Sequence, residues 1–183
     1  MIDLQEIQQY YEQNLCDRIF RYNLANGTMI DVVFYREALC HLLGIQHITN
    51  NRRFIGNSGY ERIQSGKLTA KSLKGMNRAG FGRIKHRMEF FPFLGELMEH
   101  GDLFRFYPER AGRTRIQASF LLHKEEQELL YLHLFLAKES AKSNLYAPMS
   151  YVVLTERDDN PNLYIEGQEY KKVIEKDILY IEK

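Results

Sequence analysis

Histidine, tyrosine and arginine side chains alternate with leucines in the second half of the sequence. An alternation of period two is typical of strands that place one face on a core. We expect the leucine face, which carries Leu130, Leu132, Leu134 and Leu136 with Phe104 and Phe106, to be buried. The opposite face then carries Arg105, Tyr107, Arg115, Gln117, Ser119, His123, Tyr131, His133 and, if Met149 and Tyr151 point to the core, Ser150. These groups can move a proton or hold an anion, although a solvent-facing sheet surface would show some of them too.

His41 is a second candidate for proton transfer. It lies at the edge of the apolar arc of a helix expected over residues 36–43, one turn after Glu37. A histidine at such a boundary can be half-buried and oriented by a neighbour. Such a histidine is more often a packing residue, and the sequence leaves both interpretations open.

Motifs for other chemistries are missing from the sequence. It contains no HExxH, no CxxC pair and no P-loop, and no clustered Asp or Glu pair suited to magnesium. Asp158 and Asp159 belong to a turn-like DDNP stretch. We therefore predict no metal site and no cofactor, so that any phosphodiester chemistry would be independent of metal.

The near-neutral net charge of +1 hides a strongly basic segment. Between Ile45 and Met88 there are ten basic residues and one acid, Glu61, whereas the rest of the chain is acidic. The basic residues are Arg52, Arg53, Arg62, Lys67, Lys71, Lys74, Arg78, Arg83, Lys85 and Arg87. Such a block is typical of a nucleic-acid-binding surface, to which we add Arg115, although a solvated basic face is the alternative.

The length of 183 residues favours a single domain, with the basic, glycine-rich stretch at about 46–100 as an insertion. Cys16 and Cys40 lack paired spacing, which is typical of a cytosolic protein. The N-terminus is acidic and amphipathic, unlike a signal peptide, and no apolar run is long enough to span a membrane. We expect a cytoplasmic protein.

The pattern of elements predicts an α+β fold. Asp3 should cap a first helix, and Asn26-Gly27 should form a type I′ hairpin turn. A helix broken or kinked at Pro92 should follow the basic segment, which itself should form loops and short helices. Mostly antiparallel strands should come last, in the segments LFRFYP, TRIQASFLLH, ELLYLHLFLA, PMSYVVLTE and KVIEKDILYI, with a turn at 123–126.

The stretch TMIDVVFYREALCHLLGIQHI resembles a phage-associated nuclease family of the Barnase/EndoU/colicin/RelE-like superfamily. YLHLFLAKE, the run from Tyr146 to Tyr151, and the segment from Tyr164 to Gln168 before KVIEKDILYI extend the resemblance in order along most of the chain. The resemblance implies a compact α+β RNase-like fold that cleaves RNA without metal, in a phage, mobile-element or toxin setting. His41 matches the histidine of the family's HLxG motif, and Ser150 matches the serine of its Pro-x-Ser strand.

Together these observations give the hypothesis of an endoribonuclease that leaves a 2′,3′-cyclic phosphate. His133 and His41 would be the acid and base, Arg105 or Arg115 would stabilise the phosphorane, and Tyr131 and Ser150 would position the substrate. The partners would be RNA and, in a toxin setting, an antitoxin or immunity protein. The alternative is a non-catalytic module that binds nucleic acid or protein, for example a phage inhibitor of a host defence complex.

Overall fold

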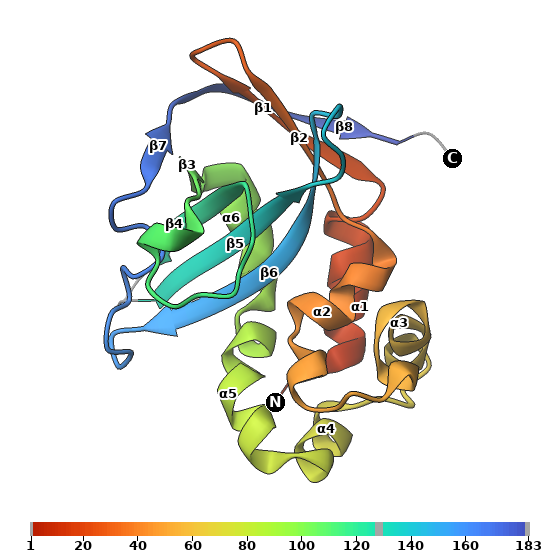
Figure 1. Ribbon diagram of the computed structural model, residues 1–183. Helices are drawn as coiled ribbons and strands as arrows, with labels where there is room; N and C mark the ends of the chain where they lie inside the picture. The colour runs from red at the N-terminus through yellow and green to blue at the C-terminus, as the bar shows by residue number, and fades with distance from the viewer. Residues whose placement is uncertain (1, 127–129, 182–183) are drawn as a thin grey trace. The chain divides into compact units, whose positions relative to one another are not determined.

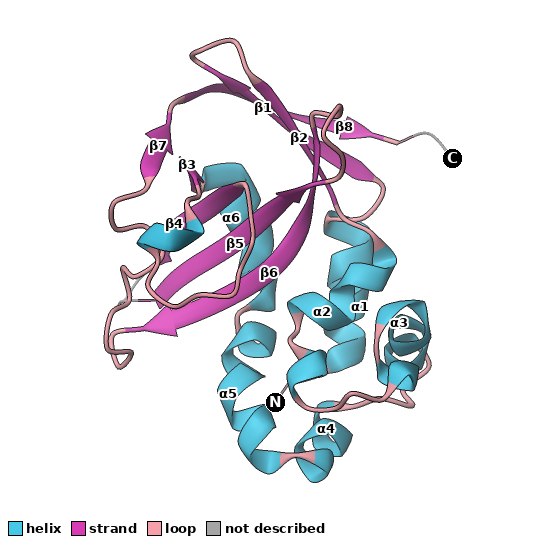
Figure 2. Cartoon of the chain, in the orientation of Figure 1, coloured by secondary structure: helices cyan, strands magenta, loops and turns pink. Residues whose placement is uncertain are grey.

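The chain divides into two units in the computed structural model, which describes residues 2–126 and 130–181; Figures 1 and 2 show its helices and strands. The first unit is helical and comprises Met1–Cys16 and Phe34–Leu94. The second comprises Asp17–Val33 and Gly95–Lys183 and holds the strands. The chain is therefore α+β, as predicted. Within the described residues, no helix is long and apolar enough to cross a membrane.

The first unit begins with the predicted helix. Its helices are α1 (Leu4–Asn14), α2 (Leu39–Leu42), α3 (Gly56–Gln64), α4 (Ala70–Met76) and α5 (Arg78–Glu89), with 3₁₀ turns at Arg36–Ala38, Ile45–His47, Arg52–Phe54 and Phe91–Phe93. Asp3 caps α1, because its carboxylate accepts a hydrogen bond from the backbone N–H of Gln5 at 2.8 Å. The helix expected over 36–43 is a 3₁₀ turn followed by the single turn α2.

Pro92 divides the long helix expected after the basic segment. Helix α5 starts within the basic segment, at Arg78, where the Asn77 side chain accepts a hydrogen bond from the Gly80 N–H at 2.8 Å. It ends at Glu89, and Pro92 lies in the following 3₁₀ turn, where its missing N–H costs no helical hydrogen bond. A separate helix, α6 (Leu94–His100), follows.

The second unit is built on one eight-stranded sheet in the order β7-β3-β4-β5-β6-β2-β1-β8. The strands are β1 (Arg18–Leu24), β2 (Met29–Val33), β3 (Asp102–Arg105), β4 (Phe120–Glu126), β5 (Leu130–Lys138), β6 (Leu145–Thr155), β7 (Glu169–Lys171) and β8 (Val173–Tyr180). Every pair is antiparallel except β2 with β6. Only Lys172 separates β7 from β8, so one continuous segment pairs with both ends of the sheet and nearly closes it, which is compatible with an RNase-like fold.

The β1–β2 hairpin is confirmed, but the predicted type I′ turn is wrong. Gly27 has φ +82°, whereas Asn26 is not among the residues with positive φ. Backbone hydrogen bonds from Gly27 to Leu24 and from Leu24 to Thr28 enclose a three-residue loop. This arrangement fits a type I turn followed by a left-handed glycine, in which asparagine needs no left-handed conformation.

Both faces of the central strands are buried, so the prediction that only the leucine face forms the core is wrong. Leu132, Leu134 and Leu136 have no exposed surface, as expected, but His133 is also 0% exposed and Tyr131 is 7% exposed. Their face carries a second core cluster of Phe106, Ala111, Leu121, Phe135 and Val152, against which the partly buried Ile116, Ala118, Tyr164 and Ile165 pack. The segments that connect the strands therefore cover the face that was expected to be open.

The register of β3 also differs from the prediction by one residue. Arg105 pairs with Phe120 and Phe104 pairs with Leu121, so Arg105 lies on the leucine face and Phe104 lies on the His133 face. Residues 123–126, which were expected to form a turn, belong to strand β4. The connection to β5 falls at 127–129, outside the described residues.

Candidate nucleic-acid site on the helical unit

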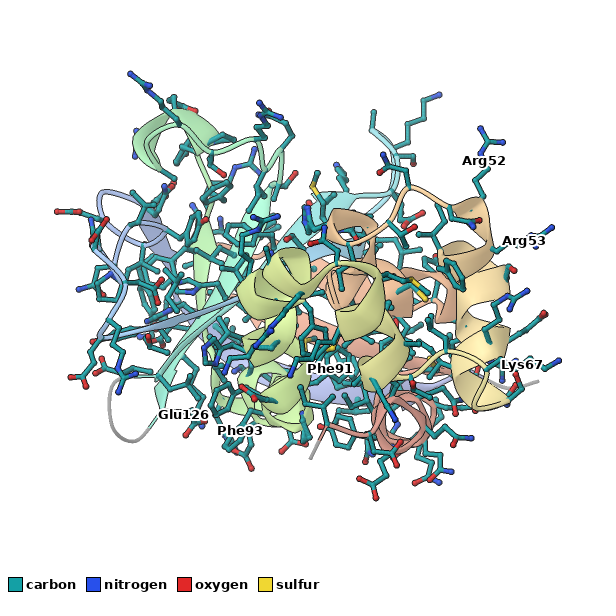
Figure 3. The ribbon with its side chains drawn as sticks, turned by 90° about the horizontal axis from the view of Figure 1, so that it is seen from below. Arg52, Arg53, Lys67, Phe91, Phe93 and Glu126 are labelled. Atoms are coloured by element: carbon teal, nitrogen blue, oxygen red, sulfur yellow. The ribbon has the colours of Figure 1, made fainter. Side chains whose placement is uncertain are left out.

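All ten residues of the predicted basic segment belong to the helical unit. Seven of them are exposed and, within the described ranges 2–126 and 130–181, form no ion pair: Arg52, Arg53, Lys67, Lys71, Lys74, Arg78 and Arg83. Arg62, Lys85 and Arg87 are half-buried. In Figure 3, Arg52, Arg53 and Lys67 point away from the ribbon into solvent. Unpaired cations of this kind are available to phosphate groups.

A tight turn after α2 holds two histidines close to one another. Gly44 adopts φ +79°, which ends α2, and its N–H donates to the carbonyl of His41 at 2.9 Å. The N–H of His47 then donates to the carbonyl of Gly44 at 2.9 Å. The Gln46 amide nitrogen donates to the His41 carbonyl at 3.2 Å and lies 3.5 Å from Nε2 of His47.

Helix α5 packs closely against this turn, because a glycine stands on each side of the contact. A Cβ added to Gly80 would lie 3.1 Å from the carbonyl oxygen of His47. A Cβ added to Gly44 would lie 3.0 Å from Cγ2 of Ile84 and 3.4 Å from Cδ of Arg87. Arg83 and Arg87 are one helical turn apart on α5, and the charges of both, with that of His41, act on His47, so the four residues lie near one another.

The surroundings lower the pKa of His47 below its usual value. Partial burial of the ring is the largest cause, and the charges of Arg87, His41 and Arg83 act in the same direction. His47 and His41 both retain exposed surface. A largely neutral imidazole beside two guanidinium groups can accept a proton from a group whose anion those arginines hold.

The residues predicted from the sheet do not form a comparable site. Tyr131, His133 and Ser150 share one face, because Ser150 pairs with Phe135 two residues from His133. Ser150 is half-buried, whereas Tyr131 and His133 are buried. Arg105 lies on the opposite face, with its guanidinium carbon 5.2 Å from the centre of the Phe120 ring. Arg115 is exposed in the segment before β4.

His133 lies on the face of the second core cluster and carries no charge near neutral pH. Burial, with a smaller contribution from the neighbouring His123, lowers its pKa to about 3. Burial also lowers the pKa of His123. Because both rings are neutral, they can pack among aromatic side chains such as Tyr131 and Tyr164 at a modest electrostatic cost.

A family model described as phage-Barnase-EndoU-ColicinE5/D-RelE like nuclease4 matches residues 3–181. The chain belongs to this nuclease family. The predicted family is thereby confirmed, and the matched range includes the basic stretch at 46–100 as well as the sheet. Comparisons with curated proteins and with solved structures found no match.

Sequence reasoning did not single out His47, which the structure places near His41, Arg83 and Arg87. The motif HLLGIQH contains both histidines, separated by Gly44. A glycine between them, which can end a helix in the left-handed conformation, was the available signal. Among the residues that the structure describes, no three His, Cys, Asp or Glu side chains form a group that could hold a metal ion.

Proposed function

We propose that the protein is an endoribonuclease that cleaves RNA without a metal ion, at the site formed by His41, His47, Arg83 and Arg87. The observation that carries this proposal is the environment of His47, whose pKa is lowered by partial burial and by the adjacent arginines. Membership of a nuclease family supports phosphodiester cleavage. The basic surface around the site supports a nucleic-acid substrate.

In the proposed reaction, neutral His47 removes the proton of a ribose 2′-hydroxyl. The 2′-oxygen forms a bond to the adjacent phosphorus, the bond from phosphorus to the 5′-oxygen breaks, and the leaving 5′-oxygen takes a proton from His41. The products are a 2′,3′-cyclic phosphate and a 5′-hydroxyl. Proton transfer of this kind typically contributes 10²–10⁴-fold to the rate.

Arg83 and Arg87 would stabilise the additional negative charge of the phosphorane. Guanidinium groups suit this role because they present several donors in a fixed plane to phosphate oxygens. The same positive charges favour the neutral form of His47 before the reaction, so His47 can act as the base. They then stabilise the negative charge of the transition state. The exposed arginines and lysines of the helical unit would hold the flanking phosphates.

His41 remains in this proposal from the sequence-based hypothesis, and His47 replaces His133. An imidazole with 0% exposed surface does not reach a phosphate in this conformation. Arg105 and Ser150 lie on opposite faces of the sheet, so they do not converge on one phosphate. We place the activity in the cytoplasm, where RNA is available. An immunity or antitoxin protein would inhibit the enzyme by covering the basic surface.

The experiment is a cleavage assay on mixed RNA, with and without EDTA, using wild-type protein and single histidine variants. His47→Gln and His41→Gln should each reduce the rate by about 10²–10⁴-fold, while EDTA should have no effect. His100→Gln is the matched control, because His100 is an exposed histidine of the other unit. Rates unchanged in both site variants would reject these roles. Tight RNA binding without cleavage by the folded wild-type protein would favour the non-catalytic binding module.

A further inference from the structure

A pocket of about 650 Å³ opens in the helical unit beside α1, α4 and α5. Its size falls in the range of small-molecule and cofactor sites. Leu4, Leu68 and Phe81 line it and are at most 9% exposed, so they give it an apolar floor. The half-buried Ala70 also lines the pocket, at the start of α4.

The charged side chains that line this pocket are of two kinds. The carboxylates belong to Asp3, which caps α1, and to Glu89, whose Oε2 lies 3.2 Å from Nδ1 of His86. The ammonium groups of Lys71 and Lys74 are exposed and form no ion pair within the described part of the chain. An apolar pocket with unpaired ammonium groups at its edge can bind a flat, weakly polar ring that is attached to a negatively charged group.

We propose that this pocket binds one unstacked base of single-stranded RNA, while Lys71 and Lys74 hold the adjacent phosphates. This inference rests on the proposed ribonuclease function and adds the class of its substrate. A base within a duplex is stacked and paired, so it cannot enter such a pocket without opening the helix. The Phe81 ring in the floor offers an apolar contact to any base, which makes the binding tolerant of sequence.

The pocket and the histidine site would contact different nucleotides of the RNA. At 100° per residue, Phe81 and Glu89 lie on one side of α5, whereas Arg83 and Arg87 lie on the other. The base in the pocket therefore belongs to a nucleotide away from the cleaved linkage. The contribution of the pocket should appear in RNA affinity and in the choice of single-stranded over duplex RNA.

The test compares two tryptophan variants that leave the charge of the protein unchanged. Ala70→Trp fills the pocket, whereas Ala79→Trp places the same side chain at an exposed position of α5 outside it. Dissociation constants are measured for a short single-stranded RNA, for the same RNA with one abasic nucleotide at each position in turn, and for its duplex. If Ala70→Trp fails to fold, Ala70→Leu replaces it as a smaller filling variant.

Wild-type protein and Ala79→Trp should lose roughly 5- to 100-fold in affinity at one abasic position, the effect of losing one stacked base. Ala70→Trp should bind the intact and abasic RNAs equally, with the same salt dependence as wild type. Equal binding of all the RNAs by wild type, or an abasic effect that persists in Ala70→Trp, would overturn the base pocket. Failure of wild type to bind or cleave any RNA would instead overturn the proposed function.

Discussion

His123 and His133 lie directly opposite each other on β4 and β5, with ring centroids 4.8 Å apart. Both are buried, and within the described residues Nδ1 of each ring lacks a hydrogen-bond partner. Protonation of His133 would place a positive charge in the core beside the His123 ring. We therefore expect this pair to make the sheet unit sensitive to acid, independently of any catalytic role.

The stability of the protein should therefore fall in acid. The pKa of His133 is about 3 in the folded protein and about 6.5 in the unfolded chain, so the unfolded chain binds more protons between these values. The stabilisation is complete above pH 6.5 and is lost progressively as the pH falls to about 3, by roughly 3–5 kcal/mol. Urea unfolding at pH 7.5, 5.5 and 4.5 measures this loss.

His133→Gln is the matched variant for this prediction, because glutamine does not titrate in this range. Its unfolding free energy should be lower than that of wild type at pH 7.5, yet should decline less steeply as the pH falls. His100→Gln should retain the wild-type slope. An identical slope in wild type and His133→Gln would show that other groups cause the acid sensitivity.

Two glycines of the helical unit should respond to alanine in opposite directions. A Cβ at Gly59 would lie 2.5 Å from the carbonyl oxygen of Phe54 and 2.6 Å from Sγ of Cys40, so Gly59→Ala should cost about 1–3 kcal/mol. A Cβ at Gly82, within α5, meets nothing within 4 Å, so Gly82→Ala should stabilise by about 0.5–1 kcal/mol. Chemical denaturation measures the free energy of unfolding of both variants. Equal effects would contradict the close contacts described for Gly59.

RNA affinity should depend on salt through the helical unit. Arg52→Ala combined with Arg53→Ala should lower the slope of log affinity against log salt by about 1.4, as expected for two lost phosphate contacts to a single strand. Lys142→Ala combined with Lys172→Ala removes the same charge from exposed positions of the other unit and should leave the slope unchanged. A filter-binding titration gives both slopes. Equal slopes for the two double variants would place the RNA elsewhere.

Local signals in the sequence predicted much of the fold. The Asp3 cap and the hairpin at Asn26-Gly27 depend on near neighbours, and the structure confirms both. The alternation of β5 correctly identified its leucine face. The matched family model confirms the resemblance that the motifs had indicated.

Features set by distant parts of the chain could not be predicted in this way. The second core forms because segments near Ile116 and Tyr164 cover the His133 face, and nothing within β5 encodes that cover. The one-residue shift of β3 reversed the side of Arg105, since a strand exchanges its faces with each step in register. His47 became a candidate only when α5 placed Arg83 and Arg87 beside it.

The most direct test of the ribonuclease proposal is the chemistry of the cleaved ends. Wild-type protein is incubated with an RNA oligonucleotide, and with the same oligonucleotide carrying 2′-O-methyl groups, and the products are identified by mass spectrometry. The proposed reaction predicts 2′,3′-cyclic phosphate and 5′-hydroxyl ends, and no cleavage on the 3′ side of a 2′-O-methyl nucleotide. Cleavage at the modified nucleotides, or products with 5′-phosphate ends, would contradict attack by the 2′-oxygen and with it the roles of His47 and His41.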